Sequence, residues 1–187
     1  VTTIAPSQNA VFDALALKSA GTIIVTSGTS FTTPSNITTS TIFFIELIGA
    51  GGGGAGTNTT NSTPGGGGGG YCFVKVTGLS PSTTYTCAIG QGGAGGAAGG
   101  NNNGNNGGNT TIVIGAVTYS ANGGAGAVAA VSTNGGAGGT ATNGDVNISG
   151  QAGGDSPTSS ATIIAGEGGD SPMGYGNGGK ETRASKT

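Results

Sequence analysis

The sequence predicts a mainly β protein, in which a small antiparallel β-domain adjoins a glycine-rich, polyglycine-II-like lattice and a short α-helix precedes both. Three observations lead to this prediction. Residues 1–20 favour a helix, residues 21–90 contain apolar segments of strand length, and residues 91–187 alternate glycine-rich runs with short β-branched segments. We expect three parts: a helical neck, a small β-domain with inserted glycine runs, and a glycine-rich region. Because the sequence starts at Val1 and not at Met, we also expect it to be a piece of a longer protein.

The N-terminal helix is predicted from a start signal, a stop signal and an apolar seam. Pro6 is a plausible first-turn residue, and Gly21 is a plausible stop. Ile4 and Val11 lie seven residues apart, and Leu15 follows Val11 by four, as in a coiled-coil seam. An isolated helix of about 12 residues is marginal in water. It therefore needs a partner, either its own downstream domain or identical copies of itself.

Four segments of the second part are typical of strands: GTIIVTSG, TIFFIELIG, YCFVKVTGL and TTYTCAIG. In the third of them, Cys72, Val74 and Val76 alternate with polar or aromatic residues, which predicts one buried face. Residues Ile42 to Ile48 are apolar at nearly every position, and we expect that strand to be covered on both sides.

Glycine supplies 44 of the 187 residues. In its longest regular stretch, glycine recurs every third residue, at Gly90, Gly93, Gly96 and Gly99, and the later runs repeat this spacing. Three residues per turn is the period of a polyproline-II-type helix, and without Cβ atoms such helices can pack backbone against backbone. A flexible linker is the alternative interpretation. The segments between the runs are rich in Ile and Val, which a linker does not need, so we favour the ordered lattice.

Charge and composition exclude several function classes. With 5 basic and 7 acidic residues, the chain lacks the basic patch that nucleic acid requires. No apolar stretch is long enough to span or insert into a membrane. The absence of histidine excludes a Ser-His-Asp triad and makes a zinc site improbable. Residues 174–181 resemble a phosphate loop but have Glu181 where Ser or Thr binds magnesium. We expect no enzyme, no cofactor and no metal.

The two cysteines and the two GGDSP motifs have structural interpretations. Cys72 and Cys87 lie in neighbouring predicted strands, so a disulfide across a hairpin is conceivable, but two free buried thiols are favoured. Asp155 and Asp170 each precede Ser-Pro, which is a turn signal. A calcium ion would need several more oxygen ligands than either motif provides.

The order of GTSFTTPSN, IFFIELIGAGGGGAG, PGGGGGGYCFVKVTGLSPSTTYTCAIGQGGAGG, NGDVNISGQAGGDS and GEGGDSPMGYGNGG resembles the glycine-rich distal domain of bacteriophage tail fibres and related receptor-binding tail proteins. APSQNAVFDALALKS is similar to short helices that precede trimeric fibre domains. The resemblance implies a virion protein of the phage tail, assembled in the bacterial cytoplasm. It implies a homotrimer, for which Ile4, Val11 and Leu15 are the candidate oligomerisation residues. It also implies attachment to an outer-membrane protein or polysaccharide of the host.

Any receptor contacts are expected in the segments between glycine runs. Tyrosine offers an apolar body with a hydroxyl group, which suits sugar and protein surfaces. The candidates are Asn102, Asn105, Tyr119, Asn134, Thr158, Met173 and Tyr175. Two other functions stay open: a purely structural fibre, head or capsid-surface component, and an ice-binding polyglycine-II protein.

Overall fold

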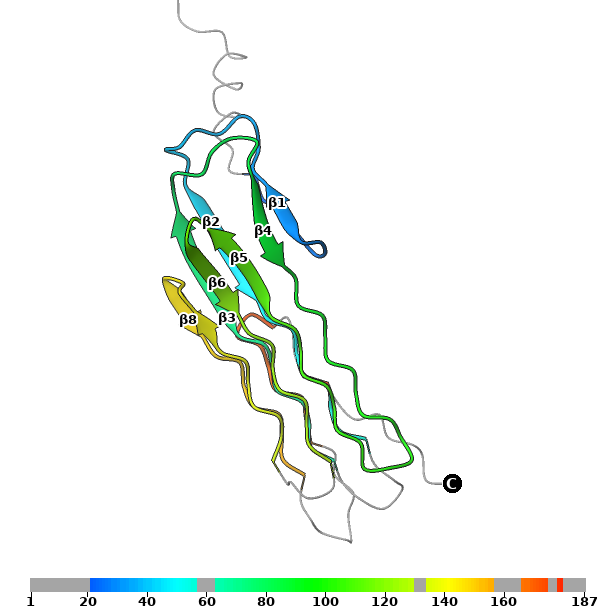
Figure 1. The fold of residues 1–187 in the computed structure, drawn as a ribbon. Coiled ribbons are helices and arrows are strands. Elements are labelled where there is room, and N and C mark those ends of the chain that lie inside the picture. Colours follow the sequence, from blue (N-terminus) through cyan, green and yellow to red (C-terminus); the bar gives the residue numbers. More distant parts are fainter. Residues whose placement is uncertain (1–20, 57–62, 130–133, 157–165, 175–177, 180–187) are drawn as a thin grey trace, which may run out of the picture.

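The computed structural model describes residues 21–56, 63–129, 134–156, 166–174 and 178–179 (Figure 1). These residues form a mainly β structure with antiparallel sheets, and they contain no helix. The predicted N-terminal helix, with its seam of Ile4, Val11 and Leu15, lies outside the described residues.

Eight short strands form two sheets. Their bounds are β1 Ser30–Thr32, β2 Phe43–Ile48, β3 Tyr71–Val76, β4 Thr84–Ala88, β5 Thr110–Ile114, β6 Val117–Ala121, β7 Ala141–Thr142 and β8 Val146–Ile148. One sheet has the order β1-β4-β5-β6-β7, and the other has the order β2-β3-β8. Every neighbouring pair is antiparallel. Strands from both sides of residue 90 therefore share each sheet, although the composition changes there.

The two sheets face each other across a small side-chain core. Leu47 and Cys72 come from the three-stranded sheet, and Cys87, Ile112 and Ala121 come from the five-stranded sheet. The aromatic rings of Phe31, Tyr85 and Tyr119 pack against this cluster. Both cysteines are free thiols, as the favoured interpretation of the sequence has it.

The alternation predicted for β3 is confirmed, because Cys72 and Val74 are buried while Lys75 is exposed. The prediction that β2 is covered on both sides is wrong. Phe44 is 66% exposed and stacks on Phe73 of β3, with ring centroids 5.9 Å apart. Only one face of the three-stranded sheet meets the other sheet, so no layer formed by the described residues covers the outer side chains of β2.

Glycine-rich backbone continues from the strands at one end of the sandwich, and Figure 1 shows these segments lying side by side below the sheets. We number the segments as runs: run 1 (49–56), run 2 (63–70), run 3 (90–97), run 4 (102–109), run 5 (122–129), run 6 (134–140), run 7 (149–156), run 8 (166–170) and run 9 (178–179). Together they form what we call the glycine layer. Runs 1, 3, 5 and 7 lead away from the sheets, and runs 2, 4 and 6 lead back to them.

Candidate functional site

Backbone hydrogen bonds join the runs at three-residue spacing. Run 1 donates to run 2 from Gly49, Gly52 and Ala55, whose N–H groups bond the carbonyls of Gly70, Gly67 and Pro64 at 2.8–3.2 Å. Run 1 donates to run 4 from Ala50, Gly53 and Gly56, whose N–H groups bond the carbonyls of Gly108, Asn105 and Asn102 at 2.8–3.1 Å. Successive residues of one run thus bond different neighbours, and every third residue returns to the same neighbour. A β-strand, with its two-residue period, does not bond in this way.

Runs 1 and 2 form the centre of the glycine layer. Residues 51–56 and 63–70 are all buried. Run 1 also accepts hydrogen bonds from runs 3, 5 and 9, while run 2 bonds runs 5, 6, 7 and 8. Almost no side chains fill this centre. Backbone hydrogen bonds therefore stabilise it, whereas apolar side chains stabilise the centre of the sandwich.

The packed positions of the layer have no room for a side chain. A Cβ atom on Gly52 would overlap the carbonyl group of Ala125, and one on Gly67 would overlap that of Ala137. Outer runs show the same restriction at every third residue: Gly136 and Gly139 of run 6 are buried, whereas Ala137 and Thr140 are exposed. The glycine spacing in the sequence therefore marks the positions where two backbones touch.

Three asparagines of run 4 extend the hydrogen bonding with their side chains. Their Oδ1 atoms accept from N–H groups of run 5, namely Asn103 from Ala129 at 2.8 Å, Asn106 from Gly126 at 2.8 Å and Asn109 from Gly123 at 3.0 Å. The sequence reasoning did not single out these residues. The signal was present, since the three asparagines repeat every third residue of NNNGNNGGN, in step with glycine.

We call the end of the glycine layer that lies away from the sheets the far end. Gly56 and Asn102 pair there by mutual backbone hydrogen bonds. The described turn at residues 98–100 joins runs 3 and 4 at this far end, and Asn102 Nδ2 donates to the carbonyl of Ala97 at 2.8 Å. Runs 1 and 2, 5 and 6, and 7 and 8 also end and begin on this side (Figure 1).

The structure does not gather the predicted receptor contacts into one site. Asn102 and Asn134 are exposed at the far end, and Asn105 is exposed one repeat nearer the sheets. Tyr119 is half-buried on β6 against the sandwich core. Met173 is 48% exposed in the turn that follows run 8, on the side toward the sheets. Thr158 and Tyr175 lie outside the described residues.

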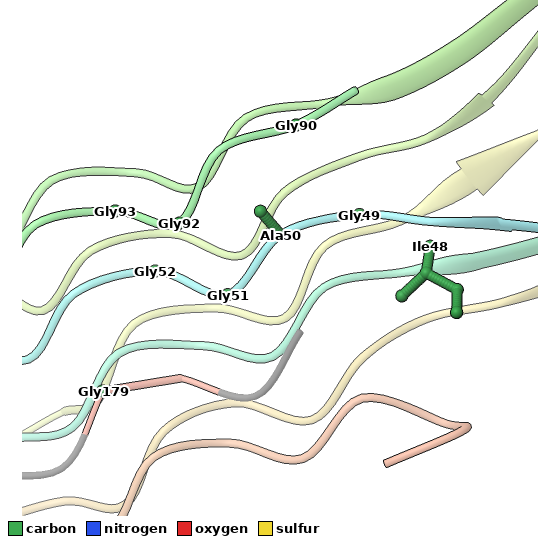
Figure 2. Close-up of a pocket in the computed structure, with 9 residues that line it drawn as sticks. All are labelled: Ile48, Gly49, Ala50, Gly51, Gly52, Gly90, Gly92, Gly93 and Gly179. Carbon is green, nitrogen blue, oxygen red and sulfur yellow. The ribbon is translucent and has the colours of Figure 1, made fainter. Parts of the chain in front are cut away.

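A groove of about 440 Å³ runs along the surface of the glycine layer. Its walls are run 1, run 3 and Gly179 of run 9, and its lining is Ile48, Gly49, Ala50, Gly51, Gly52, Gly90, Gly92, Gly93 and Gly179. Figure 2 shows that Ile48 and Ala50 are the lining residues with side chains. The remaining wall is glycine backbone.

Titratable chemistry is sparse in the described part of the chain. No group of three or more His, Cys, Asp or Glu side chains lies there in a position to hold a metal ion. Burial raises the pKa of the Cys72 and Cys87 thiols above the ordinary value of 9.0, so both are poor nucleophiles at neutral pH. Within the described ranges, no helix is long and apolar enough to cross a bilayer.

Comparison with protein families covers most of the chain. No curated protein is found to be similar to the chain. The profile of a family described as a glycine-rich domain matches residues 25–187, which include both sheets and all nine runs. The chain belongs to this glycine-rich domain family.

Proposed function

We propose that this chain is a non-enzymatic tip domain of a bacteriophage tail fibre and attaches the virion to the surface of its bacterial host. The observation that carries the proposal is the arrangement of the runs: they leave one end of a β-sandwich together and end together at the far end. Such an arrangement holds several connecting segments on one rigid support, which is how binding loops are commonly presented.

We further propose that the runs are polyglycine-II helices. The three-residue spacing of the hydrogen bonds supports this assignment, because that period belongs to polyproline-II-type backbone. Additional support comes from buried glycines at every third position of runs 6 and 8, namely Gly136 and Gly139, and Gly166 and Gly169. In this arrangement the layer is stiff, since each run is bonded to several others.

The far end is the proposed contact surface for an outer-membrane protein or a polysaccharide. The described connection at this end is residues 98–101, and the sequence joins the other pairs of run ends through residues 57–62, 130–133 and 157–165, which lie outside the described residues. Asn102 and Asn134 lie at this end, Thr158 falls within residues 157–165 of the sequence, and we propose all three as contacts. Tyr119 and Met173 are less well placed, since one packs on the sandwich core and the other lies toward the sheets. Trimer formation through Ile4, Val11 and Leu15 would present three such ends in parallel.

The proposal is tested by binding of the fluorescently labelled, purified chain to a panel of bacterial strains. We expect saturable binding to some strains and loss of binding when residues 157–165 are replaced by a Gly-Ser linker of equal length. Met173→Ser is the matched control, because it removes an exposed apolar side chain at the other end of the layer. Light scattering on the same sample measures the oligomeric state.

Two outcomes would contradict the proposal. Unchanged binding after the loop replacement would place the contact elsewhere on the molecule. A stable trimer that binds no strain in a panel that includes the host would indicate a purely structural fibre component.

A further inference from the structure

The groove beside run 1 has the position of a missing run. In the order of their mutual hydrogen bonds, run 2, run 5, run 4 and run 3 follow one another around run 1. Run 9 lies on the other side of run 2, where Gly178 contacts Gly66 and Gly179 donates to the carbonyl of Gly52 at 2.9 Å. Close packing of equal rods leaves space for one more between run 3 and run 9. The groove lined by runs 1, 3 and 9 occupies this space (Figure 2).

Some backbone N–H groups of run 1 make no hydrogen bond within the described part of the chain, and they point toward this same space. The N–H groups of run 1 fall into three sets, each of which takes every third residue. Among the described residues, the set that begins at Gly49 donates to run 2, and the set that begins at Ala50 donates to run 4. Gly51 and Gly54 form the third set. Their carbonyls accept from Gly93 and Gly96 of run 3, but their N–H groups donate no hydrogen bond within the described part of the chain. Successive N–H groups of a three-residue helix point about 120° apart, so this third set is directed between runs 3 and 9.

Run 3 presents bare glycine toward the groove. A Cβ atom on Gly92 would meet nothing within 4 Å, and the nearest atom to one on Gly95 is the Gly54 carbonyl oxygen at 3.7 Å. Elsewhere in the layer, glycine at such a spacing lies where another backbone touches it. Gly92 repeats that spacing with no described backbone within 4 Å of its Cβ position, and it lines the groove.

We propose that the groove binds an extended segment of another protein that has glycine at every third residue. Run 4 shows what this position requires: it touches runs 1, 3 and 5, keeps Gly104 and Gly107 where the backbones meet, and bears asparagine on its other sides. A carbonyl of the bound segment would accept from Gly51, which lines the groove. This is recognition by backbone hydrogen bonds, comparable to strand addition at a sheet edge.

In the printed sequence, glycine at every third residue occurs in the described runs and does not recur outside them. Outside the described residues, residues 1–20, 57–62, 130–133, 157–165 and 180–187 contain no glycine at all. The remaining three, 175–177, contain Gly176 alone and lie within the connection to run 9. We therefore assign the occupant of the groove to another molecule. This inference goes beyond attachment to a host and depends on the hydrogen-bond spacing of the runs.

The test is a titration of the full chain into a fluorescein-labelled peptide of Asn-Asn-Gly repeats, about 12 residues long so that it exceeds the ~25 Å of run 1. We expect saturable fluorescence anisotropy and no binding of the matched Asn-Asn-Ala peptide, whose Cβ atoms would overlap the groove walls. In the chain, Gly92→Leu should weaken the affinity by about tenfold or more, because the new side chain occupies open space in the groove. Ala94→Leu is the control, since Ala94 is exposed on the same run and does not line the groove.

Equal binding of the two peptides, or equal affinity of Gly92→Leu and the unaltered chain, would overturn the proposal. So would the absence of any binding. Light scattering of the peptide-free protein distinguishes a further outcome. If the unaltered chain self-associates and Gly92→Leu does not, the occupant is a second copy and the proposal of a different partner is wrong. Bacterial binding by Gly92→Leu is measured separately, so failure here leaves the proposed attachment role standing.

Discussion

The β-sandwich and the glycine layer are parts of the same chain, yet buried side chains stabilise the first and packed backbone stabilises the second. The sandwich buries Leu47, Ile112 and the two cysteines between its sheets. The layer buries residues 51–56 and 63–70, which contribute backbone and almost nothing else. A side-chain core relaxes only partly around a deleted side chain and keeps a cavity, whereas backbones already in contact have no space for an added Cβ atom. The comparison teaches that the layer should be intolerant of additions and the sandwich intolerant of deletions.

The largest effect is expected from adding one methyl group at the centre of the layer. Gly67→Ala places a Cβ atom against the carbonyl group of Ala137, and both backbones are held by hydrogen bonds. We expect the free energy of unfolding to fall by about 3 kcal/mol or more. Chemical denaturation monitored by circular dichroism measures it. Gly92→Ala is the control, with an expected change between zero and about 1 kcal/mol of stabilisation because its Cβ meets open space.

Truncation of a side chain in the sandwich core should have the second-largest effect on the free energy of unfolding. Leu47→Ala removes a buried side chain and leaves a cavity beside Cys72, which should reduce the free energy of unfolding by about 2 to 3 kcal/mol. Phe44→Ala on the exposed face of the same strand should cost clearly less. If Phe44→Ala proved the more damaging of the two, the outer face of the three-stranded sheet would be covered in solution.

Substitution of an asparagine of run 4 should lower the free energy of unfolding by less than the substitution of Leu47. Asn106→Ala removes the acceptor of the Gly126 N–H group and leaves that donor unsatisfied, at a cost of about 1 to 2 kcal/mol. Hydrogen exchange of the Gly126 amide should become faster. Asn105→Ala on the exposed side of the run is the matched control. Equal protection of Gly126 in both variants would mean that the side-chain bonds add nothing to the backbone bonds.

The smallest effect concerns the buried thiols. Burial raises the pKa of Cys72 and Cys87 above 9.0, so the folded state holds these protons to higher pH than the unfolded chain does. Their contribution to stability is complete below pH 9 and is lost as the pH rises through the raised pKa values. The denaturant concentration at the unfolding midpoint should therefore decrease as the pH is raised above about 9. In the Cys72→Ala, Cys87→Ala double variant this decrease should be smaller. Alkylation of the native protein by iodoacetamide at pH 7.5 should be slow.

Several features could be read from local pattern. The alternation in YCFVKV correctly indicated the buried face of β3, because a strand presents successive side chains to opposite faces. The mainly β class followed from the β-branched segments. The apolar run at 42–48 misled, since composition alone cannot tell whether a second layer covers a strand. The asparagines at 103, 106 and 109 were not singled out, because the run 5 backbone groups that they bond lie 14 to 26 residues further along the chain.

The sequence by itself determined where side chains are absent. Glycine at every third residue specifies which positions can touch another backbone, and β-branched residues specify where strands form, because both depend on the local geometry of a few residues. Only the tertiary structure decided which run lies beside which, that runs 1 and 2 occupy the centre, and that strands before and after residue 90 complete the same sheets. Glycine runs are almost identical to one another as local sequence. Their pairing is set by the order and register of the strands to which they are joined, and that order arises from contacts between residues far apart in the chain.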